Sequence, residues 1–324
     1  MLRRSLLASP LALTAPALAR SAWAQTYPDR PVRLVIPYPA GGSLDVVGRA
    51  VGQKFQEMTG QPLVLDNRGG ASGTLAADYV AKSRPDGLTL ILASAAQLSI
   101  ASALQPGLPY DPRTDLVPVS LLVSTPYALF ASAASGVTDL AGVLARGRAR
   151  PGQVPFGSPG NGSLGHLALE MFAQATGTQW LHVPYRGAAQ VMNDMAAGTV
   201  DLTFTVTASA RPMVEADKVR PIALAGPERT DVLPQMPTFR ELGYPQVECE
   251  LWLGVMAPKG APPAIVARLD AIFQEALRDP EARATLARSG AAITHQGPAQ
   301  FARLLESDYP RWGEVIRRGN ITLN

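Results

Sequence analysis

Two stretches of this 324-residue chain alternate apolar strand-like runs with amphipathic helices, and this alternation constrains the fold more than any other feature. In the first stretch, strands are predicted at 32–38, 62–67 and 88–94, with helices at 44–58 and 71–83 between them. Strands that alternate with helices of about 10 to 15 residues form parallel sheets, because each helix crosses the sheet to bring the next strand alongside. The sequence therefore predicts an α/β fold.

The same order restarts near Pro151. A strand at 153–158 leads into a glycine-rich loop, an apolar helix stripe runs over 164–175, and another strand is predicted at 180–185. Three dipeptides of the first stretch also recur in order, at an offset of roughly 120 residues: Ser43-Leu44 with Ser163-Leu164, Thr59-Gly60 with Thr176-Gly177, and Arg68-Gly69 with Arg186-Gly187. We expect two similarly built α/β domains, each presenting a Gly/Ser loop at a helix start.

Long extended runs place the domain boundaries. The runs 115–132 and 247–258 flank the second stretch, so we expect the chain to cross between the domains there. The tail has helical stripes over 265–277 and 298–318 that pack on the first domain. The predicted divisions are a signal peptide at 1–24, a first domain at 25–125 plus 250–324, and a second domain at 126–249.

The N-terminus is typical of an export signal. Arg3 and Arg4 precede a short Leu/Ala-rich segment, and the small-x-small triplet Ala22-Trp23-Ala24 predicts cleavage before Gln25. The arginine pair followed by Ser-Leu-Leu also fits a twin-arginine signal, so the general secretory and twin-arginine routes both stay open. Either route predicts a periplasmic protein.

Charge and composition exclude several classes of function. The net charge of +3 comes from three arginines of the predicted signal, and the chain has no long basic run, so we expect no nucleic-acid partner. Cys249 is the single cysteine, which rules out an intrachain disulfide. The three histidines lie in no zinc-binding pattern, and we expect no metal site.

The glycine-rich loop at 157–165 allows three interpretations. Its GxGxxG match fits a dinucleotide cradle, but the next strand ends at Arg186 without the acid that takes a ribose hydroxyl. Ser163 and His166 could form the nucleophile and base of a hydrolase, although the GxSxG motif that surrounds the nucleophile in many hydrolases is not matched. The third interpretation is an anion clamp, in which this loop and its counterpart at 39–43 offer N–H groups at two helix starts. The paired loops favour the clamp over ordinary helix capping.

Five segments resemble the Bug family, the substrate-binding receptors of tripartite tricarboxylate transporters (TctC-like). They cover the mature chain in order: PVRLVIPYPAGGSLDVVGRAV, VLDNRGGASG, GSPGNGSLGHLALEMF, LHVPYRGAAQVMNDMAAGTVDL and MPTFRELGYP. The resemblance implies a type II periplasmic binding protein, a Venus flytrap of two α/β domains with the ligand cleft between them. It also implies a receptor that is not an enzyme, needs no cofactor, is monomeric and passes a small organic acid to the membrane subunits of a transporter. The alternative left open is a secreted hydrolase or reductase that uses the loop at 157–165.

The resemblance further implies which residues bind the ligand. They are Tyr38, Ala40, Gly41, Gly42, Ser43, Asp45, Ser94, Ser158, Gly160, Asn161, Gly162, Ser163, His166, Tyr185 and Thr205. Asp45 has an alternative role, in which its charge complements the dipole of the following helix. Thr205 stands where the family commonly has an acid that would accept an amino group. We therefore expect a carboxylate ligand without an ammonium group.

Overall fold

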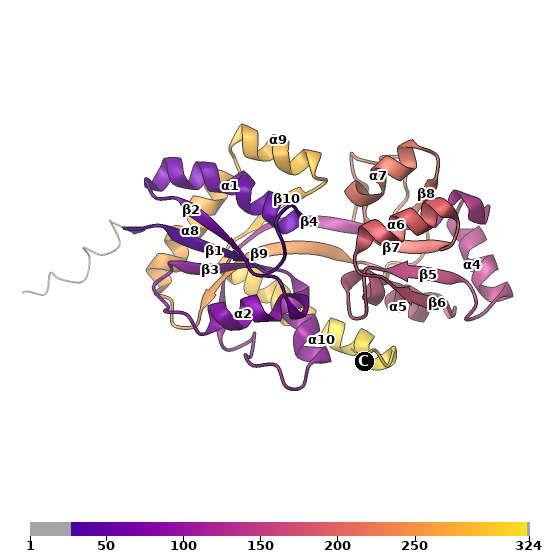
Figure 1. Ribbon diagram of the computed structural model, residues 1–324, viewed down its shortest axis with the longest axis horizontal. Coiled ribbons are helices and arrows are strands. Elements are labelled where there is room, and N and C mark those ends of the chain that lie inside the picture. The colour runs from indigo at the N-terminus through magenta and orange to yellow at the C-terminus, as the bar shows by residue number, and fades with distance from the viewer. Residues whose placement is uncertain (1–26, 323–324) are drawn as a thin grey trace, which may run out of the picture.

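The computed structural model describes residues 27–322, which form two lobes (Figure 1). The first lobe consists of β1 (Val32–Ile36), α1 (Ser43–Thr59), β2 (Leu63–Asn67), η1 (Ala71–Gly73), α2 (Thr74–Ala81), β3 (Thr89–Ala93), η2 (Ala95–Gln97), α3 (Ser99–Leu104), β9 (Glu250–Pro258), α8 (Pro263–Ala276), α9 (Pro280–Arg288), β10 (Ala292–Gln296) and α10 (Pro298–Arg318). The second lobe consists of η3 (Ala133–Ser135), α4 (Leu140–Ala149), β5 (Pro155–Ser158), α5 (Leu164–Thr176), β6 (Leu181–Pro184), α6 (Ala188–Ala197), β7 (Leu202–Val206), α7 (Thr207–Glu215) and β8 (Val219–Leu224). Strand β4 (Leu116–Ser132) belongs to both lobes.

Each lobe contains three parallel strands, as the alternation predicts, and antiparallel strands extend them into one mixed sheet. In the first lobe β1 lies between β2 and β3, and in the second β5 lies between β6 and β7, with parallel pairing in every case. The main strand order of the ten-stranded sheet is β2-β1-β3-β9-β4-β7-β5-β6, and β8 and β10 each pair with β4 off this path. Because parallel strands end at one edge of a sheet, the loops that follow β1 and β3 share one edge, and those that follow β5 and β7 share another. The predicted α/β fold is confirmed.

The first of the two predicted crossings between the lobes is strand β4. Its first part pairs with β9 up to Pro126, opposite Glu250, and its next residue Tyr127 pairs with Val206 of β7. The return crossing is the segment before β9, where Cys249 donates its N–H to Ala225 of the second lobe. Figure 1 shows both strands running through the middle of the molecule. The domain limits stated above remain a proposal.

The C-terminal helix α10 contacts both lobes. The side chain of Gln174 on α5 donates to the carbonyl of Val315, 3.3 Å away. Val315, Trp312 and Ile316 are also buried in one apolar cluster with Phe172 of the second lobe. Strand β10, which the sequence did not reveal, is short and partly polar and pairs with β4. The C-terminal tail therefore packs against both lobes and not only against the first domain.

The apolar stripes read from the sequence become the cores. On α1, Val47, Val51 and Phe55 are at most 1% exposed and pack against the first sheet. On α5, Phe172 lies 5.9 Å from the ring of Phe204 on β7. Each fully buried side chain of this size contributes about 1.5 to 3 kcal/mol. Such packing fixes the helix starts relative to the strand ends and so positions the loops between them.

Candidate functional site

The first candidate loop lies between β1 and α1 of the first lobe. Gly42 is the N-cap residue of α1, and no side chain caps this helix. Ser43 is the first helical residue, so ordinary capping by its hydroxyl is not its role. Within the described chain, the N–H groups of Ser43, Leu44 and Asp45 donate to no protein acceptor. The positive end of the α1 dipole is therefore open to an anion.

Asp45 holds this loop in shape from inside. Its carboxylate is almost fully buried and accepts hydrogen bonds from the Gly41 N–H at 3.1 Å, from Arg49 at 2.8 Å and from Asn67 at 3.2 Å. The Arg49 guanidinium holds the pKa of this carboxyl below its usual range. Gly41 has φ of +89°, a value that favours glycine. These hydrogen-bond partners engage both oxygens of Asp45 and favour a role within the loop, and direct ligand contact by Asp45 stays a prediction.

Gln97 joins three loops of the same lobe and was not predicted. Its buried amide nitrogen donates to the Tyr38 hydroxyl and to the Ser72 carbonyl, each at 2.9 Å. Its amide oxygen accepts from the N–H and the hydroxyl of Ser94, each at 3.0 Å. Ser94 and Gln97 form a capping box directly after β3, and the sequence SAAQ carried that signal. Tyr38 and Ser94 are thus coupled through one side chain.

The second candidate loop lies between β5 and α5 of the second lobe. Ser163 is the N-cap of α5 and accepts the His166 N–H at 3.3 Å. The buried Ser158 hydroxyl accepts the Gly160 N–H at 3.2 Å. Gly162 donates its N–H inward, to Nδ1 of His166 at 3.1 Å. Three N–H groups have no protein acceptor in the part of the chain that the structure describes: those of Asn161, Leu164 and Gly165.

His166 lies beneath this loop and stacks on His182 of β6. The ring centroids are 3.7 Å apart and the planes are 12° from parallel. Burial lowers the pKa of both imidazoles to about 4, so both are neutral at pH 7. His182 Nε2 lies 2.6 Å from the Ser158 hydroxyl. Sequence reasoning placed His166 at the site but gave no role to His182, because a strand histidine shows no partner in the sequence.

Tyr185 and Thr205 lie at the ends of the neighbouring strands. Tyr185 donates its hydroxyl to Asp194 at 2.6 Å, and burial raises its pKa to about 12. Thr205 is 4% exposed and pairs with Ala128 in β4. The predicted ligand contacts of both residues remain predictions.

Tyr127 lies where β4 leaves the first sheet, close to parts of both lobes. Tyr127 pairs with Val206 at the end of β7, in the second lobe. Burial, followed by the nearby Cys249 and Tyr38, raises the pKa of its phenol. Tyr38 of the first lobe and the start of α7 thus lie near the same tyrosine. Sequence reasoning missed Tyr127, because its position depends on how β4 is shared.

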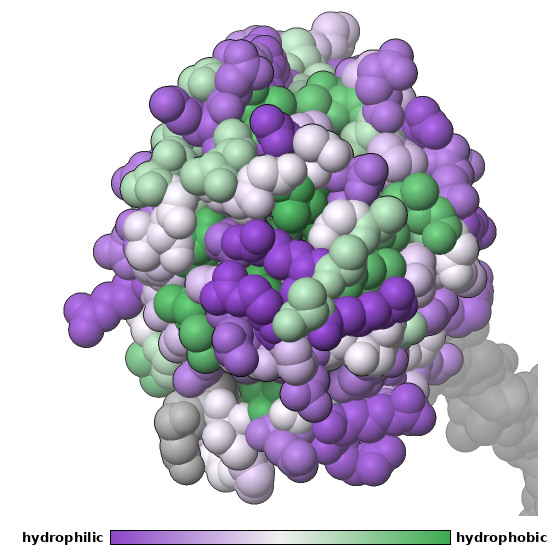
Figure 2. Space-filling view, turned by 90° about the vertical axis from the view of Figure 1, so that its right-hand side faces the viewer, coloured by the Kyte–Doolittle hydropathy of each residue, from purple (hydrophilic) through white to green (hydrophobic). Residues whose placement is uncertain are grey.

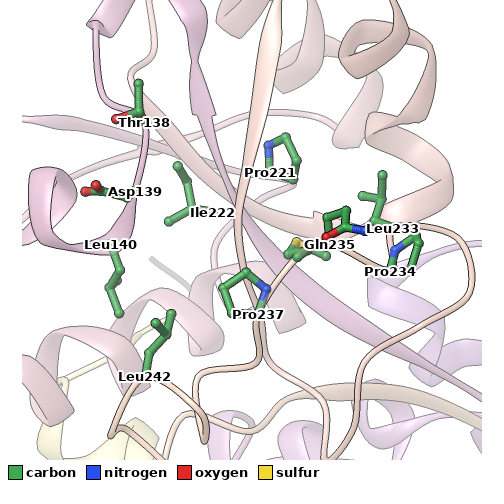
Figure 3. Close-up of a pocket in the computed structure, with 11 residues that line it drawn as sticks. Thr138, Asp139, Leu140, Pro221, Ile222, Leu233, Pro234, Gln235, Pro237 and Leu242 are labelled. Carbon is green, nitrogen blue, oxygen red and sulfur yellow. The ribbon is translucent and has the colours of Figure 1, made fainter.

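Two hollows in the surface lie outside the predicted residues. One groove of about 1170 Å³ separates α9 and β10 from α7 and the loop 227–232. A smaller pocket of about 410 Å³, lined mainly by apolar side chains such as Ile222, lies beside α4 in the second lobe (Figure 3). Figure 2, which views this lobe from its free end, shows hydrophilic residues interleaved with smaller hydrophobic areas. Neither hollow contains a residue predicted to bind the ligand.

Over residues 27–322, no group of three or more His, Cys, Asp or Glu side chains could hold a metal ion. In the same range, no helix is long and apolar enough to span a membrane. The predicted export signal at 1–24 lies outside the described residues.

Two α/β lobes joined by crossing strands are the fold of periplasmic binding proteins, and solved structures of that class share it. A Rhodopseudomonas palustris protein solved with adipate has a TM-score of 0.80 at 34% identity, covering 91% of this chain and 99% of its own. MatC from Rhodopseudomonas palustris, solved with bound malate, has a TM-score of 0.78 at 32% identity, covering 90% and 100%. The two-domain fold implied by the sequence motifs is confirmed.

The family follows from the sequence comparison. Residues 47–321 match the tripartite tricarboxylate transporter family receptor. Protein BugT of Bordetella pertussis is 35% identical over 295 residues, which cover 91% of this chain and 90% of BugT. The chain therefore belongs to the TctC receptor family, and the resemblance seen in its motifs is confirmed.

Proposed function

We propose that this protein is an extracytoplasmic receptor that captures a small organic carboxylate between its two lobes. It delivers the ligand to the membrane subunits of a tripartite tricarboxylate transporter, or reports it to a sensor. Membership of the TctC receptor family supports this function. Two structural relatives solved with malate and with adipate support a carboxylate as the ligand.

One observation carries the proposal: each lobe presents a helix start whose N–H groups have no protein acceptor. In the described chain these groups belong to Ser43 and Leu44 on α1 and to Leu164 and Gly165 on α5. A helix N-terminus carries roughly half a positive charge and stabilises an anion by about 0.3 to 1 kcal/mol, rising to about 2 kcal/mol where it is partly buried. Two such ends hold a carboxylate without a lysine or arginine.

The surrounding acids disfavour a ligand with an ammonium group. The charge of Asp45 is balanced by Arg49, and its oxygens also accept hydrogen bonds from Asn67 and Gly41, so they are not free for an amine. Position 205 carries a threonine instead of an acid. The ligand class that fits is a dicarboxylate, a tricarboxylate or an aromatic acid.

Catalysis by Ser163 and His166 has little geometric support. The contact between them runs from the backbone N–H of His166 to the serine oxygen, and the imidazole Nδ1 is occupied by Gly162. Ser158 does contact His182, but Ser158 is fully buried and out of reach of a substrate. A receptor that does not turn over its ligand is the better interpretation.

The experiment is a thermal-shift screen of the mature protein against organic acids that include malate, adipate, citrate and benzoate. A true ligand at about 100 times its Kd adds roughly 2.7 kcal/mol of stability. Isothermal titration then measures the affinity, and mass spectrometry checks that the acid is recovered unchanged. Ester hydrolysis without any shift from the acids would contradict the proposal and favour a hydrolase.

A further inference from the structure

We propose that His166 and His182 are positioning residues, a stacked pair that sets which N–H groups of the segment 158–165 face the ligand. The inference rests on the proposed function of the same loop. Neither ring needs to touch the ligand for this role.

His182 fixes the first half of the loop. Parallel pairing of β5 and β6 sets His182 opposite Phe156, two residues before Ser158. From there its Nε2 lies 2.6 Å from the Ser158 hydroxyl, which in turn accepts the Gly160 N–H. Since Ser158 is completely buried, His182 is a partner that water cannot replace without opening the loop.

His166 fixes the second half. Its Nδ1 accepts the Gly162 N–H at 3.1 Å, and an N–H that donates inward is not offered to an anion. This acceptor role also determines the tautomer: Nδ1 carries no proton, and the ring N–H is at Nε2. Nε2 faces Glu170 of the same helix, with 3.8 Å between Nε2 and the nearer carboxylate oxygen. The N–H groups left for the ligand are those of Asn161, Leu164 and Gly165.

The stack joins the two halves and keeps both rings neutral. Two imidazolium rings with centroids 3.7 Å apart would repel one another, and His166 is buried while His182 is partly buried. Glu170 is the charged group that faces the pair from α5, and Ser158 on β5 is neutral. A proton on Nδ1 of His166 would place an N–H donor opposite the Gly162 N–H, so this hydrogen bond would be lost and the loop would be released.

Matched substitutions separate hydrogen bonding from ring packing. His182→Gln keeps a polar atom near the place of Nε2, whereas His182→Phe keeps the stacked ring without it. His166→Asn keeps an acceptor near the place of Nδ1, whereas His166→Phe does not. We expect both Phe variants to weaken binding of the tightest acid from the screen by about tenfold or more, and the Gln and Asn variants to stay within about threefold of the parent.

A second measurement needs no ligand. In ¹⁵N-labelled parent protein, the amide of Gly162 should be protected from exchange at pH 7 and should shift on acidification with a midpoint of about 4. The His166→Asn variant should keep the protection and lose this titration. A merely structural histidine would not make the Gly162 signal follow imidazole protonation.

The two measurements distinguish the possible failures. Unchanged affinity in both Phe variants overturns the positioning role, as does a Gly162 amide in the parent that neither is protected nor titrates. If no acid binds the parent while the Gly162 amide behaves as expected, the pair does shape the loop and the proposed receptor function is wrong. The parent titration decides the matter even where a Phe variant does not fold.

Discussion

Replacing Gln97 with methionine tests whether one buried amide holds the ligand-facing loops of the first lobe together. Gln97 is 0% exposed, and its amide bonds Tyr38, Ser72 and Ser94 at 2.9 to 3.0 Å. Methionine has a similar length and no hydrogen-bonding amide, so the substitution removes these bonds while the volume stays close to the original.

The expected loss of stability follows from the partners left behind. Each lost hydrogen bond costs about 0.5 to 1.5 kcal/mol, and a buried donor left without an acceptor costs about 1 to 3 kcal/mol. The Ser94 N–H is such a donor, since Ser94 is 4% exposed. Tyr38 and Ser72 are accessible enough to regain water, and the apolar methionine recovers part of the loss. We expect a net destabilisation of about 2 to 4 kcal/mol.

Urea unfolding followed by circular dichroism measures this loss. The matched control is Gln300→Met, because Gln300 is exposed on α10 and its side chain makes no hydrogen bond in the described structure. The control should unfold within about 0.5 kcal/mol of the parent. A Gln97→Met variant as stable as the control would show that the buried amide contributes nothing that methionine cannot replace.

Three further predictions concern other parts of the chain. The pKa values of His166 and His182 are about 4 in the folded state against an ordinary 6.5, so acid protonates these residues in the unfolded chain first. The free energy of unfolding should therefore be largest above pH 6.5 and fall towards pH 4, by up to about 3 kcal/mol per histidine. Urea unfolding midpoints at about pH 7.5 and about pH 4.5 check this. Gly160→Val should abolish carboxylate binding in titration calorimetry, because φ is +147° and an added Cβ lies 3.3 Å from the Tyr185 carbonyl; unchanged affinity would remove this loop from the site. Cys249 is buried and its thiol pKa is raised, so iodoacetamide should leave the native protein unmodified and label it only after unfolding; rapid native labelling would contradict its burial.

Much of the fold was open to prediction, because its signals are local. The apolar spacing of Val47, Val51 and Phe55 specifies which face of a helix is buried, and each of these side chains is found in the core. The predicted helix over 298–318 matches α10 at both ends, since Pro298 suits a first helical turn. By contrast, β10 was not predicted, because a short polar strand depends on β4 to form.

The candidate site shows where the sequence alone reaches its limit. Two Gly/Ser loops at helix starts could be recognised from the residues alone, since glycine freedom and dipole direction are properties of a few consecutive residues. Three features depend on the folded arrangement of distant segments: the inward N–H of Gly162, the stack of His182 on His166, and the place of Tyr127 between the lobes. These contacts join separate strands and helices, and their energies exist only once packing has brought those elements together. A loop able to bind an anion can thus be recognised from a few neighbouring residues. The whole fold determines which of its N–H groups face that anion.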